Sequence, residues 1–302
     1  MRFADCRRHR VRATPARLLP VPVLMALLVG AALAQSPFRF EQVSPETLRL
    51  TEAGQPVFEY HPGVMLPPGV PEDRARCCYL HPVWAPNGVV LTDDFPKDHY
   101  HHRGIFWAWP VVRIGGEQYD LWTIKGIHQR TLKTLAKDTL SHSAVLAVLN
   151  GWFLGERQVV EETVRITVHP AAGGSRRLDF DLAWEAAGAP VVLRGDPTDN
   201  KGYGGLSVRV APREHTAIVT DRGRAAGDSN MEPHAWAEQS GRFEKGRAAL
   251  RIDIDPGHPG FPNGWCIRHY GFLGVNFPGN ETYTLAPGRP LRLKYTVTVQ
   301  SR

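Results

Sequence analysis

The chain has 302 residues and carries 36 Lys and Arg against 30 Asp and Glu, a formal net charge of +6. Six of the arginines and one aspartate lie within residues 1–34, so residues 35–302 hold 30 basic and 29 acidic side chains. This nearly neutral remainder has no basic run and no alternation of basic and aromatic residues, which argues against nucleic acid as a partner.

Residues 1–34 have the order of features typical of a secretory signal peptide. A head with six arginines precedes an apolar stretch at 18–34, which ends in the small-residue site Ala-Leu-Ala. Cleavage after Ala34 would place the remaining chain in the periplasm or outside the cell, without a membrane attachment. An uncleaved membrane anchor is the alternative, but two prolines interrupt the apolar run, which falls short of the ~20 residues that a spanning helix needs.

Short alternating segments separated by Gly, Pro, Asn and Asp fill residues 35–302. Strands with one buried and one wet face are predicted most clearly at 178–185 and 291–300. Further strands are predicted at 38–43, 47–51, 57–61, 105–114, 159–168, 206–210, 248–254 and 271–277. Helical periodicity is hard to find there, and no linker divides the segment. The sequence predicts one all-β domain, a large antiparallel β-sandwich whose connecting loops carry the function.

Signal cleavage would leave three cysteines, Cys77, Cys78 and Cys266. An odd number in an oxidising compartment allows at most one ordinary disulfide, from Cys266 to one of the other two, and buried free thiols are an equal alternative. Because no CxxC pair is present, a cysteine zinc site is not expected.

Residues 97–109 read KDHYHHRGIFWAW and place three histidines beside an arginine. If this segment is extended, His99 and His101 point to one face and could share a ligand or a divalent metal ion. The pair alone is a weak metal signal, and histidines in polar loops often bond only to backbone or water. His102 and Arg103 combine a titratable ring with a fixed cation, which suits an anionic or hydroxyl-rich ligand.

A second cluster lies at 196–206, where glycines permit close backbone approach and Lys201 sits at the entry to a strand. A bulged hairpin with a surface lysine is the alternative interpretation. The GxxxxGK[ST] spacing of a phosphate-binding P-loop is missing.

Two later segments, 227–236 and 258–271, mix Trp, His, Arg, Asn and acids. A sugar site needs such a mixture, because an aromatic face packs on the apolar side of a pyranose and polar groups bind its hydroxyls. Glu232 and His258 are candidates for proton transfer. Trp265 is a candidate for stacking on the sugar ring, with a purely structural place in the core as the alternative.

The chain resembles the bacterial "methane oxygenase PmoA" family of secreted proteins in three segments. These are YLHPVWAPNGVVLTDDFPKDHYHHRGIFWAW, KGYGGLSVR and HPGFPNGWCIRHYGFLGVNFPG. A true membrane methane monooxygenase subunit needs several spanning helices, whereas this sequence has one apolar run. The resemblance instead implies a galactose-mutarotase-like supersandwich. Its recurrent positions are matched by His99, His101, His102, Arg103, Lys201, His258, Trp265 and Arg268, whereas the segment around Glu232 matches only loosely.

The resulting hypothesis is a secreted carbohydrate-active enzyme that acts on a sugar or glycoside by acid–base catalysis, through hydrolysis, elimination or epimerisation. Proton transfer is assigned to His102, His258 and Glu232. Substrate binding is assigned to His99, His101, Arg103, Lys201, Trp265 and Arg268. The alternatives are a non-catalytic carbohydrate-binding module and a metal-dependent oxidoreductase or hydrolase with His99 and His101 as ligands. The histidine segment, Lys201 and residues 258–268 are expected to meet in one sugar-sized cleft at one end of the sandwich.

Overall fold

The computed structural model describes Met1 and residues 36–302. These residues form strands and two single-turn 3-10 helices, η1 (Glu72–Arg74) and η2 (Thr198–Asn200), and no α-helix occurs among them. The predicted signal peptide and its cleavage site lie outside the described residues. Within the described part of the chain, no helix has the length and apolar character needed to cross a membrane.

The first large sheet has nine strands in the order β1-β2-β3-β4-β5-β13-β20-β19-β16. Their bounds are β1 (Phe38–Ser44), β2 (Thr47–Glu52), β3 (Gln55–His61), β4 (Tyr79–Val83), β5 (Ile105–Ala108), β13 (Gly205–Arg209), β20 (Phe272–Val275), β19 (Gly264–Arg268) and β16 (Ser229–Pro233). Every residue of β5, β13 and β20 is buried, so both faces of the middle of this sheet are covered by protein.

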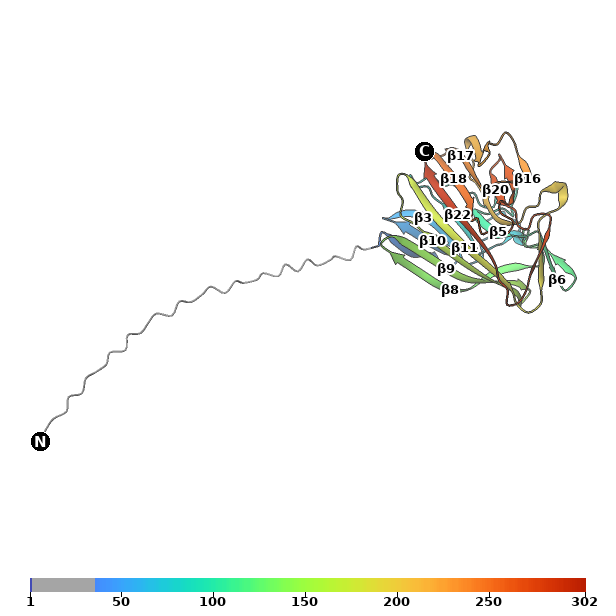
Figure 1. Cartoon of the computed structure of the whole chain (residues 1–302), viewed down its shortest axis with the longest axis horizontal. Helices are drawn as coiled ribbons and strands as arrows, with labels where there is room; N and C mark the ends of the chain where they lie inside the picture. The colour runs from blue at the N-terminus through green and yellow to red at the C-terminus, as the bar shows by residue number, and fades with distance from the viewer. Residues whose placement is uncertain (2–35) are drawn as a thin grey trace. The chain divides into compact units, whose positions relative to one another are not determined.

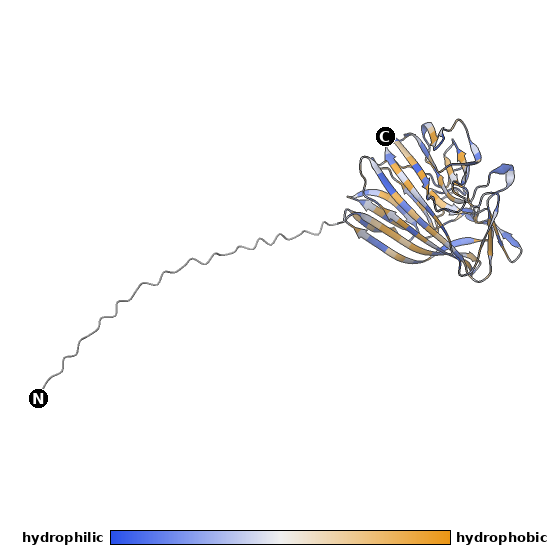
Figure 2. Ribbon diagram, in the orientation of Figure 1, coloured by the Kyte–Doolittle hydropathy of each residue, from blue (hydrophilic) through white to orange (hydrophobic). Residues whose placement is uncertain are grey.

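The second large sheet also has nine strands, in the order β15-β14-β17-β18-β22-β11-β10-β9-β8. Their bounds are β15 (Gly223–Arg224), β14 (Glu214–Thr220), β17 (Trp236–Phe243), β18 (Gly246–Ile254), β22 (Leu291–Ser301), β11 (Ser175–Ala186), β10 (Arg157–Val168), β9 (Ser143–Leu154) and β8 (His128–Leu140). Burial alternates along β11 and β22, and Figure 2 shows hydrophobic and hydrophilic residues alternating along the long strands of this sheet. The two alternating strands predicted from the sequence are therefore confirmed.

A third, four-stranded sheet has the order β21-β12-β6-β7, with β21 (Thr282–Leu285), β12 (Val191–Arg194), β6 (Val111–Ile114) and β7 (Glu117–Tyr119). Figure 1 shows β6 well away from β3 at the other side of the folded part. The single strand predicted at 105–114 is wrong, because β5 and β6 belong to different sheets. The break falls at Pro110, which lacks the N–H that a continuous strand would need.

All paired strands of the three sheets run antiparallel, as their registers show for β10 and β11 and for β13 and β20. Aromatic side chains join the two large sheets, since Trp109, which follows β5, packs 5.5 Å from Trp152 of β9 and 5.1 Å from Trp184 of β11 between ring centroids. The predicted all-β class with large antiparallel sheets is confirmed.

A buried carboxylate links side chains of neighbouring strands on the inner face of the second sheet. Glu162 of β10 is fully buried and accepts hydrogen bonds from the indole N–H groups of Trp152 and Trp184, each at 2.8 Å. The side-chain amides of Asn150 and Gln129 donate to it as well. These four donors replace the water that an ionised carboxylate loses on burial.

The same network reaches toward the histidine segment. Gln129 accepts a hydrogen bond from Arg76 at 3.2 Å, and Arg76 also donates to the backbone oxygen of Trp122 at 3.3 Å. Arg76 is buried, so its guanidinium is held by these fixed oxygens rather than by water. The position of Trp122 is thereby tied to the core between the sheets.

Candidate functional site

A cavity of about 300 Å³ brings together segments that are far apart in the sequence. It is lined by His99, His101, His102, Trp122, Lys201, Tyr203, Cys266, Arg268, Tyr270 and Phe272. Residues of β19 point alternately to its two faces, so Cys266 and Arg268 face this cavity while the buried Trp265 lies on the opposite side. The histidine segment, Lys201 and Arg268 therefore share one site.

The histidine segment forms a turn and not the extended strand that the sequence suggested. The His99 N–H donates to the Pro96 carbonyl at 2.9 Å, and the His102 N–H donates to the His99 carbonyl at 2.8 Å. This turn places all three imidazoles together. The rings of His99 and His102 stack with centroids 4.6 Å apart and planes 2° apart, and His101 lies edge-on to both, at 5.6 and 4.7 Å.

Aromatic rings extend this stack on both sides. Tyr270 stacks on His99 at 5.4 Å, and Phe272 stacks on His102 at 4.9 Å between centroids. Trp122 lies edge-on to His102 at 6.1 Å and packs 4.7 Å from Tyr203. The cavity thus has aromatic walls with polar nitrogens set between them, which suits a ligand with both apolar faces and hydroxyl groups.

Asp98 orients His99 from outside the cavity. Its Oδ2 lies 3.0 Å from His99 Nδ1, although the ring N–H is not aligned for a regular hydrogen bond. Both carboxylate oxygens of Asp98 accept from Arg209, at 3.0 and 2.9 Å. Burial acts to raise the pKa of Asp98, but the contacts with His99 and Arg209 outweigh it and lower the pKa. The ionised carboxylate favours a proton on Nδ1 of His99, which leaves Nε2 as the proton acceptor.

His101 and His102 are held neutral. Burial, reinforced by His99 and by nearby arginines, lowers the pKa of His101 to about 4. Burial, reinforced by His101 and His99, lowers the pKa of His102 well below its usual value. The Nδ1 atom of His102 is buried and has no hydrogen-bond partner among the described residues. Neutral imidazoles can each donate one hydrogen bond and accept another, as binding of hydroxyl groups requires.

Two cations complete the lining. The Lys201 ammonium lies 3.5 Å from Asp199 Oδ2, and the side chain is 35% exposed. The Arg268 guanidinium donates to the backbone oxygens of Ser229 and Ile267, each at 2.8 Å, and to Asn230 Oδ1 at 2.6 Å. No Asp or Glu is among the residues that line the cavity. The site therefore carries net positive charge.

Arg103, assigned to substrate binding from the sequence, has a structural role instead. Its side chain is fully buried and donates to the backbone oxygens of Tyr100, His102 and Arg74. The guanidinium also lies 3.5 Å from the centroid of the Phe95 ring. A cation placed under the turn fixes the turn's carbonyls, so Arg103 supports the histidine cluster from behind and does not line the cavity.

Trp265 and His258 also lie away from the cavity. Trp265 is fully buried and its indole N–H donates to the His234 carbonyl at 2.8 Å, so it cannot stack on a ligand. His258 is buried, with Nδ1 2.9 Å from the Pro259 carbonyl and Nε2 2.8 Å from the Tyr295 hydroxyl. Both its ring nitrogens have protein partners, which leaves neither for proton transfer to a substrate.

Glu232 lines a different cavity, beside the β14–β15 hairpin. Its carboxylate is 48% exposed and lies 3.8 Å from both Arg222 and His234. It does not meet the three histidines, so the shared acid–base role proposed for it from the sequence has no geometric support.

No preformed metal centre accompanies the histidines. Among residues 36–302, no group of three or more His, Cys, Asp or Glu side chains is arranged to hold a metal ion. Within the same range Cys77, Cys78 and Cys266 are buried free thiols, and the Cys77 and Cys78 sulfurs lie 3.2 Å apart. The pairing of Cys266 with either of them is not present.

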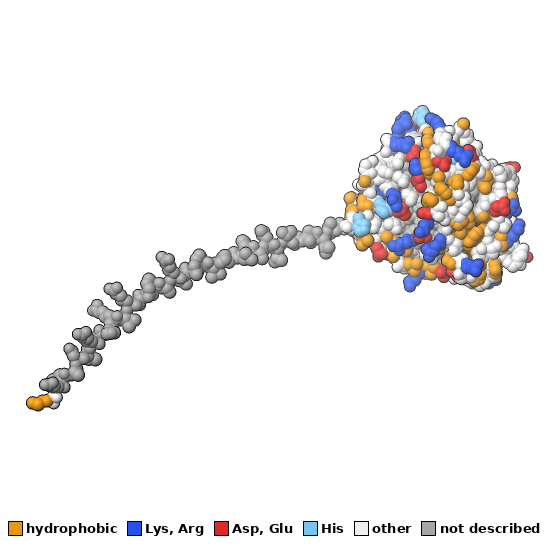
Figure 3. Space-filling model, viewed as in Figure 1, with side chains coloured by type: hydrophobic (Ala, Val, Ile, Leu, Met, Phe, Trp, Pro, Cys, Tyr) orange, Lys and Arg blue, Asp and Glu red, His pale blue; other side chains and the backbone are white. Residues whose placement is uncertain are grey.

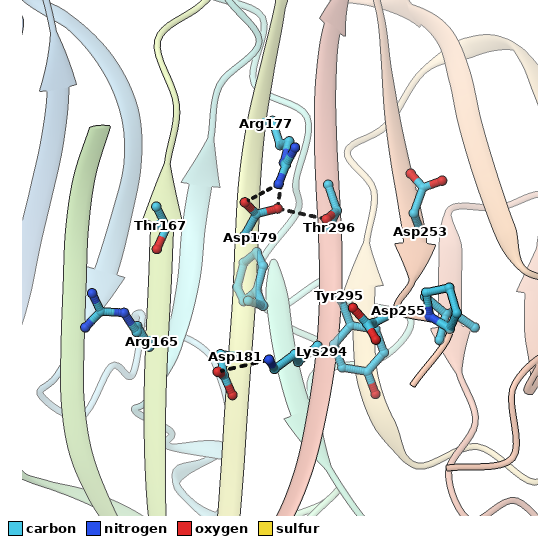
Figure 4. Close-up of a pocket in the computed structure, with 13 residues that line it drawn as sticks. Arg165, Thr167, Arg177, Asp179, Asp181, Asp253, Asp255, Lys294, Tyr295 and Thr296 are labelled. Carbon is cyan, nitrogen blue, oxygen red and sulfur yellow. Dashed lines mark hydrogen bonds and ion pairs between the residues drawn. The ribbon is translucent and has the colours of Figure 1, made fainter. Parts of the chain in front are cut away.

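A larger cavity, of about 580 Å³, lies on the wet face of β10, β11, β22 and β18 (Figure 4). Several of its charges are already paired, since Arg177 and Thr296 bind Asp179 and Lys294 lies near Asp181. Figure 3 likewise shows Lys and Arg interspersed with Asp and Glu over one face of the molecule. We therefore place the candidate site at the histidine cavity, where buried polar atoms lack partners.

Solved structures similar to this chain include three related to sugar epimerases. A GalM/aldose epimerase homologue from C. elegans is 9% identical, with a TM-score of 0.36, and the match covers 88% of this chain and 99% of that one. A putative mutarotase from Salmonella typhimurium is 9% identical, with a TM-score of 0.39 and coverage of 88% of this chain and 94% of that one. A galactose mutarotase related enzyme from Lactobacillus acidophilus is 8% identical, with a TM-score of 0.36 and coverage of 87% of this chain and 97% of that one. Likeness at this level establishes neither a ligand nor an activity for this chain.

No curated protein matches the sequence. The methane oxygenase name suggested by the sequence resemblance finds no support in these comparisons. Residues 47–302, nearly the whole of the described part, match one family. The chain belongs to the family of unknown function DUF6807.

Proposed function

We propose that this protein is an exported enzyme that binds a sugar or glycoside in the histidine cavity and acts on it by acid–base catalysis. The observation that carries the proposal is the pairing of His99 with Asp98 at 3.0 Å beside two neutral imidazoles and four aromatic walls. A cavity of about 300 Å³ suits a single sugar ring.

In this proposal His99 is the proton carrier, in place of His102. Its side chain is 37% exposed, so a ligand can reach it, whereas His102 is only 4% exposed as a residue and its low pKa makes it a weak base. Asp98 stabilises the imidazolium that forms when His99 accepts a proton at Nε2. His101 and His102 bind hydroxyl groups, and Lys201 and Arg268 stabilise a developing oxyanion.

Elimination and epimerisation next to a carbonyl group each need one group to take a proton and another to stabilise negative charge, and the site offers both. Hydrolysis of a glycoside instead needs a group that protonates the leaving oxygen, which a protonated His99 would supply. A glycosidase that uses two carboxylates is less favoured, because no Asp or Glu lines the cavity. Export to the periplasm or beyond rests on the signal-peptide pattern of residues 1–34 alone.

The test is a screen of monosaccharides and aryl glycosides for thermal stabilisation and for turnover, with wild type compared with His99→Gln. We expect turnover to fall by about 10² to 10⁴ in His99→Gln, the range attributed to a general acid or base. His142→Gln, at an exposed turn between β8 and β9, is the matched control and should retain full activity. Full activity in His99→Gln would overturn the catalytic role. Sugar binding without turnover in wild type would replace the enzyme with a binding module.

A further inference from the structure

We infer that the cavity selects a sugar that carries a carboxylate, such as a uronic acid, through Arg268 and Lys201. This inference rests on the proposed function and narrows its substrate class. It begins from the charge of the lining, which includes two permanent cations and no carboxylate.

The acids nearest in sequence to the cavity are already engaged. Asp98 is bound by Arg209, and the Asp228 carboxylate accepts from the backbone N–H of His269 at 2.7 Å and lies 3.0 Å from its ring. Asp199 does approach Lys201, but it is 76% exposed and the pair is 3.5 Å apart, which makes the interaction weak in water. Asp196, which approaches Tyr203, accepts from the backbone N–H of Thr198 at 3.0 Å. None of these acids pairs with Arg268, so the charge of Arg268 is left for a ligand to neutralise.

Arg268 is oriented for this task before any ligand arrives. All three of its hydrogen bonds go to neutral oxygens, and none of the described carboxylates lies within ion-pair distance of it. These bonds fix the plane of the guanidinium while its charge stays uncompensated. A planar guanidinium binds a carboxylate through paired hydrogen bonds that a neutral hydroxyl cannot reproduce.

The remaining lining argues for an anion with a sugar body and not for a bare ion. Trp122, Tyr203 and Phe272 supply apolar surface that a small inorganic anion would leave without contacts. The neutral rings of His101 and His102 supply hydrogen-bonding groups for hydroxyls, without the added charge that would hold a free anion. A polyhydroxylated ring with one carboxylate uses all of these groups.

The experiment compares binding of D-glucuronate and D-galacturonate with that of D-glucose and D-galactose by calorimetry at low ionic strength. We expect the acids to bind about tenfold or more tightly than their neutral partners, as charge-assisted hydrogen bonds predict. Arg268→Gln should bring the affinities for the acids to within about threefold of those for the neutral sugars, because the acids lose their charged partner. The preference should also shrink when salt is added.

Arg268→Lys keeps the charge without the planar guanidinium and should recover part of the preference for acids over neutral sugars. If Arg268→Gln does not fold, Lys201→Gln provides an independent variant, in which this preference should also fall. Equal binding of neutral sugars and their acids to wild type would overturn this inference and leave the proposed function standing. Acetate or phosphate binding as tightly as the uronates would overturn it too, since the sugar body would then contribute nothing. No binding of any of the four sugars would count against both proposals.

Discussion

At the scale of single residues, the site depends on histidines whose protonation is set by their surroundings. His101 and His102 keep neutral rings because burial disfavours the imidazolium, and the neighbouring cations add to that effect. His99 differs from both in its contact with a carboxylate, since Asp98 Oδ2 lies 3.0 Å from its Nδ1. In the proposed function, the three histidines therefore divide into one proton carrier and two neutral hydrogen-bonding groups.

The low pKa of His101 predicts a pH dependence of stability. In the unfolded chain His101 titrates near its ordinary pKa of about 6.5, and in the folded chain it does so at about 4. Between these values the unfolded state binds more protons, so folding loses stability as pH falls, by at most about 1.4 kcal/mol per pH unit. Urea unfolding of wild type and His101→Gln at pH 7 and pH 4.5 isolates this contribution from the other titrating groups. We expect wild type to lose stability relative to the variant at pH 4.5. The same difference in unfolding free energy at both pH values would contradict a neutral, half-buried ring at His101.

At the scale of elements, the histidine turn is held against the sheet by a close backbone approach at Gly104. A Cβ atom at this position would lie 2.1 Å from the Leu80 carbonyl oxygen and 2.9 Å from His81 Cβ. Leu80 and Ile105 form the pairing that joins β4 to β5, directly after the turn. Only glycine permits the strand edge and the turn to lie this close.

Gly104→Ala should therefore destabilise the fold by about 1 to 3 kcal/mol, because the backbone around Leu80 must move to admit a methyl group. Gly227→Ala is the matched control, since a Cβ there would meet nothing within 4 Å. Its effect should stay within about 0.5 kcal/mol. Chemical denaturation of both variants checks this, and equal stabilities would show that the close approach between β4 and the turn is absent in solution.

The strands and turns also show which parts of the structure could be predicted from the sequence. Alternation predicted β11 and β22 because each has one wet face. The residue mixture at 258–271 singled out Arg268, which lines the same cavity as the histidines. It could not decide the role of Trp265, since a large aromatic residue suits a core and a sugar site equally. The turn at His99–His102 was missed because it depends on backbone hydrogen bonds that no residue pattern announces.

Other parts of the site depend on contacts between distant segments. No local pattern in the sequence marks Trp122 or Phe272 as site residues, yet both pack against His102. The sequence carries one local signal for Asp98, which is that this acid directly precedes His99. Arg103 was misassigned because sequence alone does not distinguish a buried arginine that binds carbonyls from one that faces a ligand.

At the scale of the whole molecule, the two large sheets are joined by a buried polar network as well as by apolar packing. Tyr60 of β3 donates to Asn150 of β9 at 3.2 Å, and Asn150 donates to Glu162. Through Gln129 and Arg76 the same network reaches Trp122 in the wall of the site. The site therefore rests on the packing of the sandwich and not on its own loops alone.

Replacement of the network's central carboxylate should be costly. In Glu162→Gln one carboxylate oxygen becomes an N–H₂ group, which cannot accept from the donors that face it. Buried N–H groups then lack acceptors, and we expect a loss of about 2 to 5 kcal/mol. Glu161→Gln is the matched control, because the adjacent side chain points to the wet face of β10. It should change the free energy of unfolding by less than about 0.5 kcal/mol. Similar effects of the two variants in guanidinium unfolding would rule out the central role of Glu162.

The central claim, that the histidine cavity is the carbohydrate site, is tested most directly by NMR of the imidazole rings of the folded protein. The protein would be labelled at histidine and titrated with D-glucose, D-galactose and their uronates. The account predicts that at least one of these sugars shifts the ring signals of His99, His101 and His102 in a saturable manner, while the exposed His142 and His215 stay unchanged. Saturable binding that moves only the signals of His258 or His234, or no shift of the three cavity histidines with any of the four sugars, would contradict it.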